Sequence, residues 1–205
     1  EARLMNYKWY AALAYTRANK LNRIVIDAPQ ARFGIMTAGK AYLDTRQALA
    51  DLGLDDAACA RVGIRLIKIG CVWPLNAQDA REFATGLEEI LVIEEKRQIL
   101  EYALKEELYN WRDDVRPKVY GKFDEKDNAG GEWSVPRGQW LLPAHGELSP
   151  ALIARAIARR LEKADLPIEL RNAIARGATG VQVRLAATIS GATLAAPVNA
   201  APRGI

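Results

Sequence analysis

Short apolar runs along the chain predict buried β-strands. Residues 24–26, 64–69 and 90–93 are rich in Ile, Val and Leu and are bounded by Gly, Pro or charged residues. This pattern is typical of strands that are buried on at least one face. With a less regular run that begins at Phe33 and a short run after Lys118, we expect strands near residues 23–27, 33–37, 64–69, 89–93 and 118–121.

Stretches with helical periodicity separate these runs. Residues 2–20 contain no internal Gly or Pro and predict a leading helix. Asp55 and Asn76 are suited to cap two later helices, and Ser149 followed by Pro150 is a strong helix start. Because strand and helix alternate, the predicted fold class is α/β, with three layers and a mostly parallel sheet that carries helices on both faces.

The character of the sequence changes twice after this alternating region. From Asp124 the chain becomes polar and Gly-rich without periodicity, and its last part is dominated by Ala, Gly, Thr and Pro. We therefore expect a leading helix over 1–22, an α/β core over 23–123, an irregular loop segment over 124–147, C-terminal helices over 148–176, and a weakly structured tail or linker over 177–205.

Composition narrows the class of protein. Among 205 residues, 50% are hydrophobic and 26% are charged, which predicts a folded globular chain of one large domain or one domain with appendages. No run approaches the roughly 18 apolar residues of a membrane span. Cys59 and Cys71 match no disulfide or metal spacing, and His145 is the single histidine, so we expect no bound metal and a reduced, cytoplasmic location.

The charge balance gives no sign of a nucleic-acid partner. Lys and Arg number 29 against 25 Asp and Glu, which gives a net charge of +4. Residues 151–205 carry 8 basic and 3 acidic residues, but the arginines there are spread along a predicted helix without interleaved aromatics. We interpret them as a solvated helix face and expect neither nucleic-acid nor membrane binding.

One glycine motif resembles a phosphate-binding loop but lacks its chemistry. Gly34 to Lys40 match G-x-x-x-x-G-K, yet Ala41 follows where a P-loop needs a hydroxyl for magnesium, and Gly34 lies inside a predicted strand. Gly39 at a strand-to-helix turn would still expose backbone N–H groups beside Lys40. That arrangement suits an anion or a carboxylate.

Two further loops follow predicted strands in the same way. Trp73 follows one strand, and Glu94 and Lys96 follow another. Since ligands bind beyond the carboxyl ends of the strands in open α/β sheets, Gly39, Lys40, Trp73, Glu94 and Lys96 form a candidate cofactor-binding rim. The alternative, a rim of turn residues and surface ion pairs, stays open. No G-x-S-x-G or G-x-G-x-x-G motif is present, and we identify no catalytic residue.

Six stretches read together resemble a known family. They are residues 33–44, 63–75, 86–97, 105–110, Arg116-Pro117 and residues 145–150. In this order they resemble the middle region of indolepyruvate ferredoxin oxidoreductases, within the 2-oxoacid:ferredoxin oxidoreductase family. The resemblance covers about residues 1–160. It implies a domain like the C-terminal domain of transketolase, set between two thiamine-diphosphate-binding domains.

The resemblance also implies a function. Enzymes of this family oxidatively decarboxylate an aryl pyruvate to an acyl-CoA, using thiamine diphosphate and [4Fe-4S] clusters, with electrons passing to ferredoxin. This sequence contains neither the family's G-D-G thiamine signature nor its cluster-binding cysteine runs. We therefore expect a non-catalytic domain that holds no cofactor itself and is inactive alone.

The partners follow from the same resemblance. They are the adjacent thiamine-diphosphate domains, ferredoxin and CoA for the complete enzyme, and a second copy in a homodimer. The alternative is a stand-alone α/β ligand- or partner-binding module, and the continuation of the reading frame on both sides would distinguish the two. The particular 2-oxo acid is not encoded in this segment.

Overall fold

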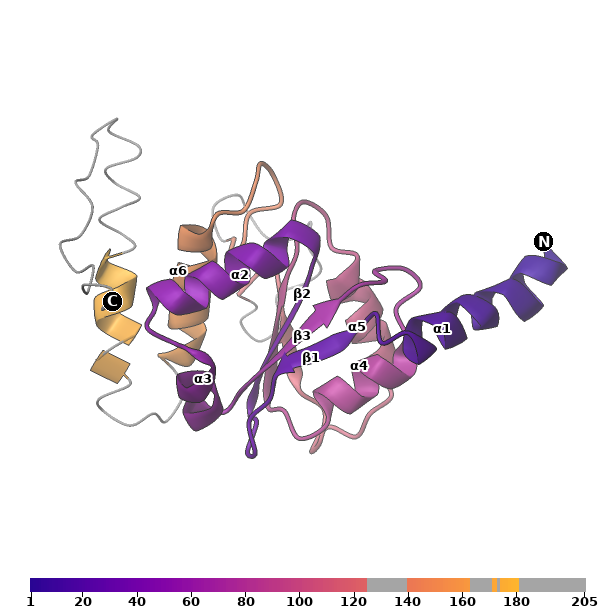
Figure 1. The fold of residues 1–205 in the computed structure, drawn as a ribbon, viewed down its shortest axis with the longest axis horizontal. Helices are drawn as coiled ribbons and strands as arrows, with labels where there is room; N and C mark the ends of the chain where they lie inside the picture. Colours follow the sequence, from indigo (N-terminus) through magenta and orange to yellow (C-terminus); the bar gives the residue numbers. More distant parts are fainter. Residues whose placement is uncertain (125–139, 163–170, 173, 181–205) are drawn as a thin grey trace, which may run out of the picture.

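Helices cover both faces of a five-stranded sheet in the computed structural model, which describes residues 1–124, 140–162, 171–172 and 174–180 (Figure 1). All the strands expected from the sequence are present. The elements are a π-helical turn η1 (Leu4–Lys8), α1 (Trp9–Ala18), β1 (Arg23–Ile26), β2 (Phe33–Ala38), α2 (Gly39–Asp51), α3 (Asp56–Val62), β3 (Ile64–Ile69), α4 (Ala77–Ala84), β4 (Glu89–Ile93), α5 (Leu100–Leu108), β5 (Lys118–Tyr120) and α6 (Pro150–Leu161).

The sheet is mostly parallel, as the sequence predicts. Its strand order is β1-β3-β2-β4-β5, and β2, β3, β4 and β5 pair in parallel, with Ile35 opposite both Leu66 and Leu91. Only β1 runs antiparallel, along β3. From the central strand β2 the chain continues to β3, which lies on one side of β2, and then to β4, which lies on the other side of β2. The strand order therefore reverses between β2 and β4.

Alternating side chains divide the core into two apolar layers. Ile35 and Leu91 face one layer with α2, α3 and α6, while Met36 and Val92 face the other with α4 and α5. All four are at most 1% exposed. Each such burial contributes roughly 1.5–3 kcal/mol, so continuous apolar strands are stable only with helices on both faces. The three-layer α/β prediction is confirmed.

The helix ends follow the expected local chemistry. The carboxylate of Asp55 accepts a hydrogen bond from the backbone N–H of Ala58, and the Asn76 side chain accepts two at the start of α4. Ser149 caps α6 and Pro150 begins it. These caps satisfy N–H groups that have no partner within a helix.

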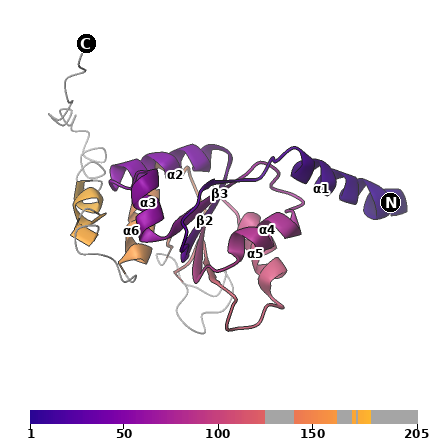
Figure 2. The same ribbon diagram turned by 60° about the horizontal axis from the view of Figure 1, so that its bottom comes forward.

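The leading helix extends away from the sheet, as Figures 1 and 2 show. The Trp9 ring meets the Trp73 ring edge-on, with centroids 4.7 Å apart, and Arg17 forms ion pairs with Asp79 at 2.6 Å and Glu82 at 2.8 Å. These contacts hold its C-terminal half against the body of the protein.

Two predicted segments lie largely outside the described residues. They are most of the loop segment over 124–147 and most of the tail over 177–205. Residues 174–180 are helical, so this helix continues past residue 176.

Candidate functional site

Lys40 joins three segments at the carboxyl edge of the sheet. It follows Gly39, whose φ of 56° turns the chain directly from β2 into α2. The Lys40 Nζ lies 2.6 Å from Asp44 Oδ2 and 3.5 Å from Glu95 Oε1, and it donates a hydrogen bond to the Leu148 carbonyl at 3.1 Å. The loops after β2 and β4 therefore meet, as is expected for loops that follow neighbouring parallel strands.

The contact lies at the point where the strand order reverses. Lys40 follows β2 and Glu95 follows β4, and these neighbouring strands continue into helices on opposite faces of the sheet. Such a reversal opens a crevice in doubly wound sheets. Near this point, the buried Thr37 Oγ1 has no hydrogen-bond partner among the described residues, whereas Glu95 Oε1 is paired with Lys40 at 3.5 Å. Thr37 thus has a hydroxyl group whose bonding capacity is not used near the carboxyl end of β2.

The ammonium group of Lys40 is already paired with neighbouring carboxylates. Its hydrogen bond to Asp44 raises the pKa of the ammonium group, and the nearby charges of Asp44 and Glu95 act in the same direction. Lys40 is therefore protonated at neutral pH and is not a general base. An incoming anion would compete with the two carboxylates for this ammonium.

Glu94 caps the next helix. Its carboxylate accepts hydrogen bonds from the backbone N–H groups of Ile99, Leu100 and Glu101 at 2.9–3.0 Å, and the side chain is buried. Three donors at the start of α5 are satisfied in this way. Glu94 is thus at the predicted edge of the sheet, with its oxygens turned toward α5.

Lys122 and Glu101 are buried beside this cap, and sequence reasoning missed both. Lys122 is 1% exposed and donates from Nζ to the carbonyl of Glu94. The Glu101 carboxylate accepts from the Lys122 backbone N–H at 3.2 Å and from Lys105 Nζ at 2.9 Å. No local sequence pattern identifies Lys122 and Glu101 as a pair, because α5 and the segment after β5 come together only when the sheet has folded.

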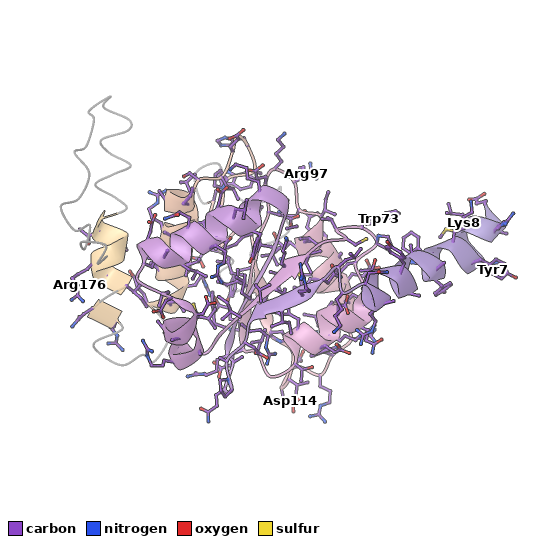
Figure 3. The ribbon with its side chains drawn as sticks, viewed as in Figure 1. Tyr7, Lys8, Trp73, Arg97, Asp114 and Arg176 are labelled. Carbon is purple, nitrogen blue, oxygen red and sulfur yellow. The ribbon has the colours of Figure 1, made fainter. Side chains whose placement is uncertain are left out.

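The structure separates Trp73 from the meeting point of the other loops. Trp73 is 67% exposed and packs against Trp9 on the leading helix. Lys96 is exposed with a φ of 58° in the loop after β4. Figure 3 shows Trp73 toward α1, whereas Arg97, next to Lys96, lies near the start of α2. A role for Trp73 or Lys96 in binding a cofactor stays a prediction.

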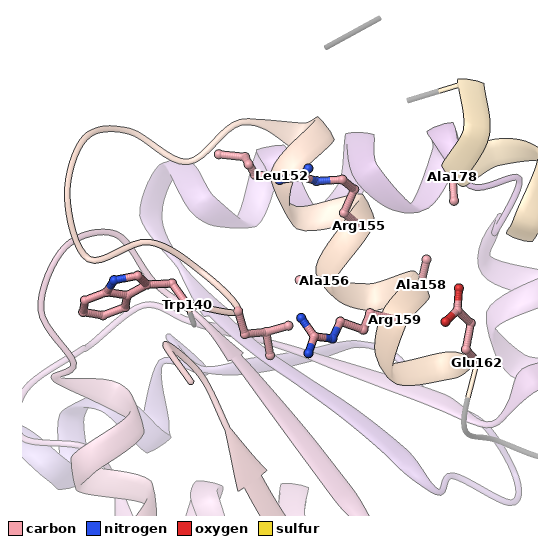
Figure 4. Close-up of a pocket in the computed structure, with 9 residues that line it drawn as sticks. Trp140, Leu152, Arg155, Ala156, Ala158, Arg159, Glu162 and Ala178 are labelled. Carbon is pink, nitrogen blue, oxygen red and sulfur yellow. The ribbon is translucent and has the colours of Figure 1, made fainter. Parts of the chain in front are cut away.

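A cavity of about 380 Å³ lies beside α6 (Figure 4). Arg155 and Arg159 line it together with Trp140, whose ring stacks on Phe123 with centroids 4.6 Å apart. Arg159 is paired with Asp124 at 2.6 Å. None of the five predicted rim residues lines this cavity. No local motif marks this cavity, because its walls come from residues 140–141, residues 152–162 and Ala178, which meet only in the folded protein.

Two classes of site are not found in the part of the chain that the structure describes. There, no three His, Cys, Asp or Glu side chains are placed to share a metal ion. Among the same residues, no helix has the length and apolar character needed to cross a membrane.

The sheet, its two helix layers and the reversal of strand order between β2 and β4 define a doubly wound α/β domain. Residues 22–189 match the family model of the indolepyruvate ferredoxin oxidoreductase middle domain. Since this match extends over most of the chain, the chain belongs to the indolepyruvate ferredoxin oxidoreductase middle-domain family.

Curated relatives agree with the family match. Indolepyruvate oxidoreductase subunit IorA of Pyrococcus horikoshii is 28% identical over 98 residues, which cover 47% of this chain and 14% of that subunit. The IorA subunit of Methanothermobacter marburgensis is 32% identical over 83 residues, 40% of this chain and 12% of that subunit. The matched region is thus a small part of these relatives.

Two solved structures are similar to the chain at low identity. The 2-oxoglutarate:ferredoxin oxidoreductase from Magnetococcus marinus has a TM-score of 0.38 and 17% identity, covering 68% of this chain and 19% of that one. A split-gene transketolase has a TM-score of 0.40 and 12% identity, covering 69% of this chain and 41% of that one. Both TM-scores are below 0.5, and the fold class rests on the sheet and its helix layers.

Proposed function

We propose that this chain is the non-catalytic α/β domain of an indolepyruvate:ferredoxin oxidoreductase. The match of residues 22–189 to the family's middle domain carries this proposal. The complete enzyme would oxidatively decarboxylate an aryl pyruvate to an acyl-CoA and reduce ferredoxin. Thiamine diphosphate and [4Fe-4S] clusters would be held by its other domains, and the enzyme would be a cytoplasmic homodimer.

The charged groups described above support a structural role for this domain. Glu94 and Glu101 are engaged by backbone N–H groups, and Lys40 is held by Asp44. Groups engaged in this way fix loops and helix ends. They are poorly placed to exchange protons with a substrate.

An activity assay tests the proposal. We expect the purified chain to show no turnover with indolepyruvate, thiamine diphosphate, CoA and ferredoxin or a dye acceptor. The complete reading frame should encode thiamine-diphosphate domains on both sides of this segment, and its product should turn over the same mixture. Turnover by this chain alone, or a reading frame without those domains, would contradict the proposal and favour a stand-alone binding module.

We further propose that the rim around Gly39, Lys40, Trp73, Glu94 and Lys96 faces an adjacent thiamine-diphosphate domain or the path of CoA. The meeting of the loops after β2 and β4 at the strand reversal supports this proposal, because ligands of open α/β sheets bind beyond the carboxyl ends of the strands at such a point.

Lys40→Ala in the complete enzyme tests the rim. We expect a rise in KM for CoA or a fall in kcat of about tenfold, the order of effect of losing one hydrogen bond from a charged group. Arg46→Ala is the matched control, because Arg46 is on the same helix and forms a surface ion pair with Asp56 at 2.9 Å. Unchanged kinetics in Lys40→Ala with an intact fold would remove this residue from the reaction path.

A further inference from the structure

The outward face of the leading helix carries aromatic and small side chains that the rest of the described structure leaves uncovered. Tyr7, Tyr10 and Tyr15 are 71%, 65% and 63% exposed. Ala11 and Ala14 are exposed between them. Large exposed apolar groups that gather on one element mark an interaction surface. We call these five residues the tyrosine–alanine face.

The opposite face of the same helix already docks on the protein. Trp9 contacts Trp73, Thr16 is 2% exposed, and the Asn76 side chain donates to the Leu13 carbonyl at 3.2 Å. Successive residues of a helix are rotated by about 100°. Residues 9, 13 and 16 therefore share one side, and Ala11 and Ala14 lie on the other.

The tyrosine–alanine face has the shape of a helix-packing surface. Ala11 and Ala14 lack bulk, so a second helix can approach to the 8–10 Å typical of packed helices. Tyr10 and Tyr15 flank this strip, and Tyr7 continues it toward the N-terminus. Tyrosine is enriched at interfaces because its ring buries apolar area while its hydroxyl forms a hydrogen bond.

The charged residues beside the tyrosine–alanine face indicate the charge of the partner that would bind there. Arg3 and Lys8 are exposed at the same end of the helix, and among the described residues neither has an acidic partner. Figure 3 shows Lys8 and Tyr7 at the end of the helix that is farthest from the sheet. Ammonium, guanidinium and phenol groups all donate hydrogen bonds, so carboxylates complement this face.

We propose that the tyrosine–alanine face binds an amphipathic helix whose apolar stripe is flanked by Asp and Glu. A second copy of this chain fits less well, because residues 1–20 contain four cations and the single acid Glu1. A membrane surface also fits less well, since membrane-bound helices carry a broad face of Leu, Phe and Trp. This binding does not depend on the enzyme proposed above. The isolated chain would bind an acidic helix whether or not it is a domain of that enzyme.

A binding assay with two synthetic peptides tests the inference on the chain itself. The acidic peptide has about three heptads with Leu at the two core positions and Glu at the flanking positions, and its counterpart has Lys in place of Glu. Fluorescence anisotropy should show that the acidic peptide binds and the basic one does not. Added salt should weaken the binding, because exposed charges are screened.

Variants locate the surface and its charge. Ala11→Glu should weaken binding of the acidic peptide by about tenfold or more while keeping the helix, because Glu is a good helix former. Leu43→Glu is the control, since Leu43 is 66% exposed on α2. Arg3→Glu with Lys8→Glu should transfer the preference to the basic peptide.

Four results would overturn the inference. They are no binding of the acidic peptide, equal binding of both peptides, self-association that Ala11→Glu abolishes, and binding to phosphatidylserine vesicles that the same variant abolishes. The third would identify a second copy as the occupant, and the fourth a membrane. Helicity of each variant is checked by circular dichroism.

Discussion

Individual buried side chains in this protein are held in position by contacts with residues that are distant in the sequence. Gly121 illustrates this, because a Cβ at that position would lie 2.0 Å from Glu101 Oε2. The Glu101 carboxylate is already fixed by Lys105 and by the Lys122 backbone N–H. A glycine is therefore required for the close approach of this carboxylate to the chain after β5.

Cys59 gives a prediction about pH at the same scale. It is fully buried in α3, and burial, followed by the charge of Asp56, raises the pKa of its thiol from 9.0 to about 12. Above pH 9 the unfolded chain loses this proton while the folded chain keeps it. Stability should therefore fall as the pH rises from about 9 toward 12.

Urea unfolding at pH 8, 9 and 10 under reducing conditions measures this effect. Relative to Cys59→Ala, the wild-type free energy of unfolding should fall by up to about 1.4 kcal/mol per pH unit above pH 9. Cys71→Ala should follow the wild type, because it retains Cys59. Parallel curves for wild type and Cys59→Ala would show that the thiol ionises equally in both states.

At the scale of elements, α5 depends on an acid that precedes it by several residues. Glu94 is six residues before Leu100, the first residue of the helix, and the loop folds back so that one carboxylate reaches three N–H groups. A usual N-cap is adjacent to the helix and bonds two or three residues ahead. The spacing therefore hides this cap from sequence analysis.

Glu94→Ala should lower the free energy of unfolding by about 1–3 kcal/mol, because it leaves buried N–H groups without an acceptor. Glu94→Gln should lose less, since it retains one acceptor oxygen. Lys96→Ala, at an exposed position in the same loop, is the control. Equal stability of Glu94→Ala and Lys96→Ala in urea unfolding would argue against the cap.

At the scale of the whole molecule, an arginine connects α6 to the sheet. Arg160 donates to both oxygens of Glu89 at 2.6 Å, pairs with Asp124, and lies 3.7 Å from the centre of the Tyr120 ring. Burial disfavours its charge, but the hydrogen bonds to Glu89 raise the pKa of Arg160 above the ordinary value. One side chain thus ties a helix to β4 and β5.

Arg160→Ala should lower the free energy of unfolding by about 3 kcal/mol, because it leaves Glu89 without its partner in a partly buried place. Arg160→Lys should restore only part of the lost free energy of unfolding, since a lysine cannot form the bidentate hydrogen bonds to Glu89. Arg155→Ala on the exposed side of the same helix is the control. Faster hydrogen exchange confined to α6 would identify the loosened element, and unaltered exchange there would contradict the argument.

The sequence predicts the elements of this fold better than their arrangement. Strands and caps could be predicted because apolar runs and residues such as Asn76 and Ser149 act locally. The antiparallel direction of β1 could not, since a four-residue strand carries no signal of direction. The contact between the loops of Lys40 and Glu95 follows from the parallel sheet, whereas the packing of Trp73 on Trp9 depends on where the leading helix docks.

The antiparallel direction of β1 has a practical consequence. Because Arg23 pairs with Lys68 near the end of β3, the chain enters the sheet from the same edge that carries Lys40. An affinity tag or a solid support attached through residue 1 is therefore joined, by way of the leading helix, to the edge of the sheet that carries the rim. Attachment through the loop 27–32, which is at the opposite edge, would leave the rim facing solution.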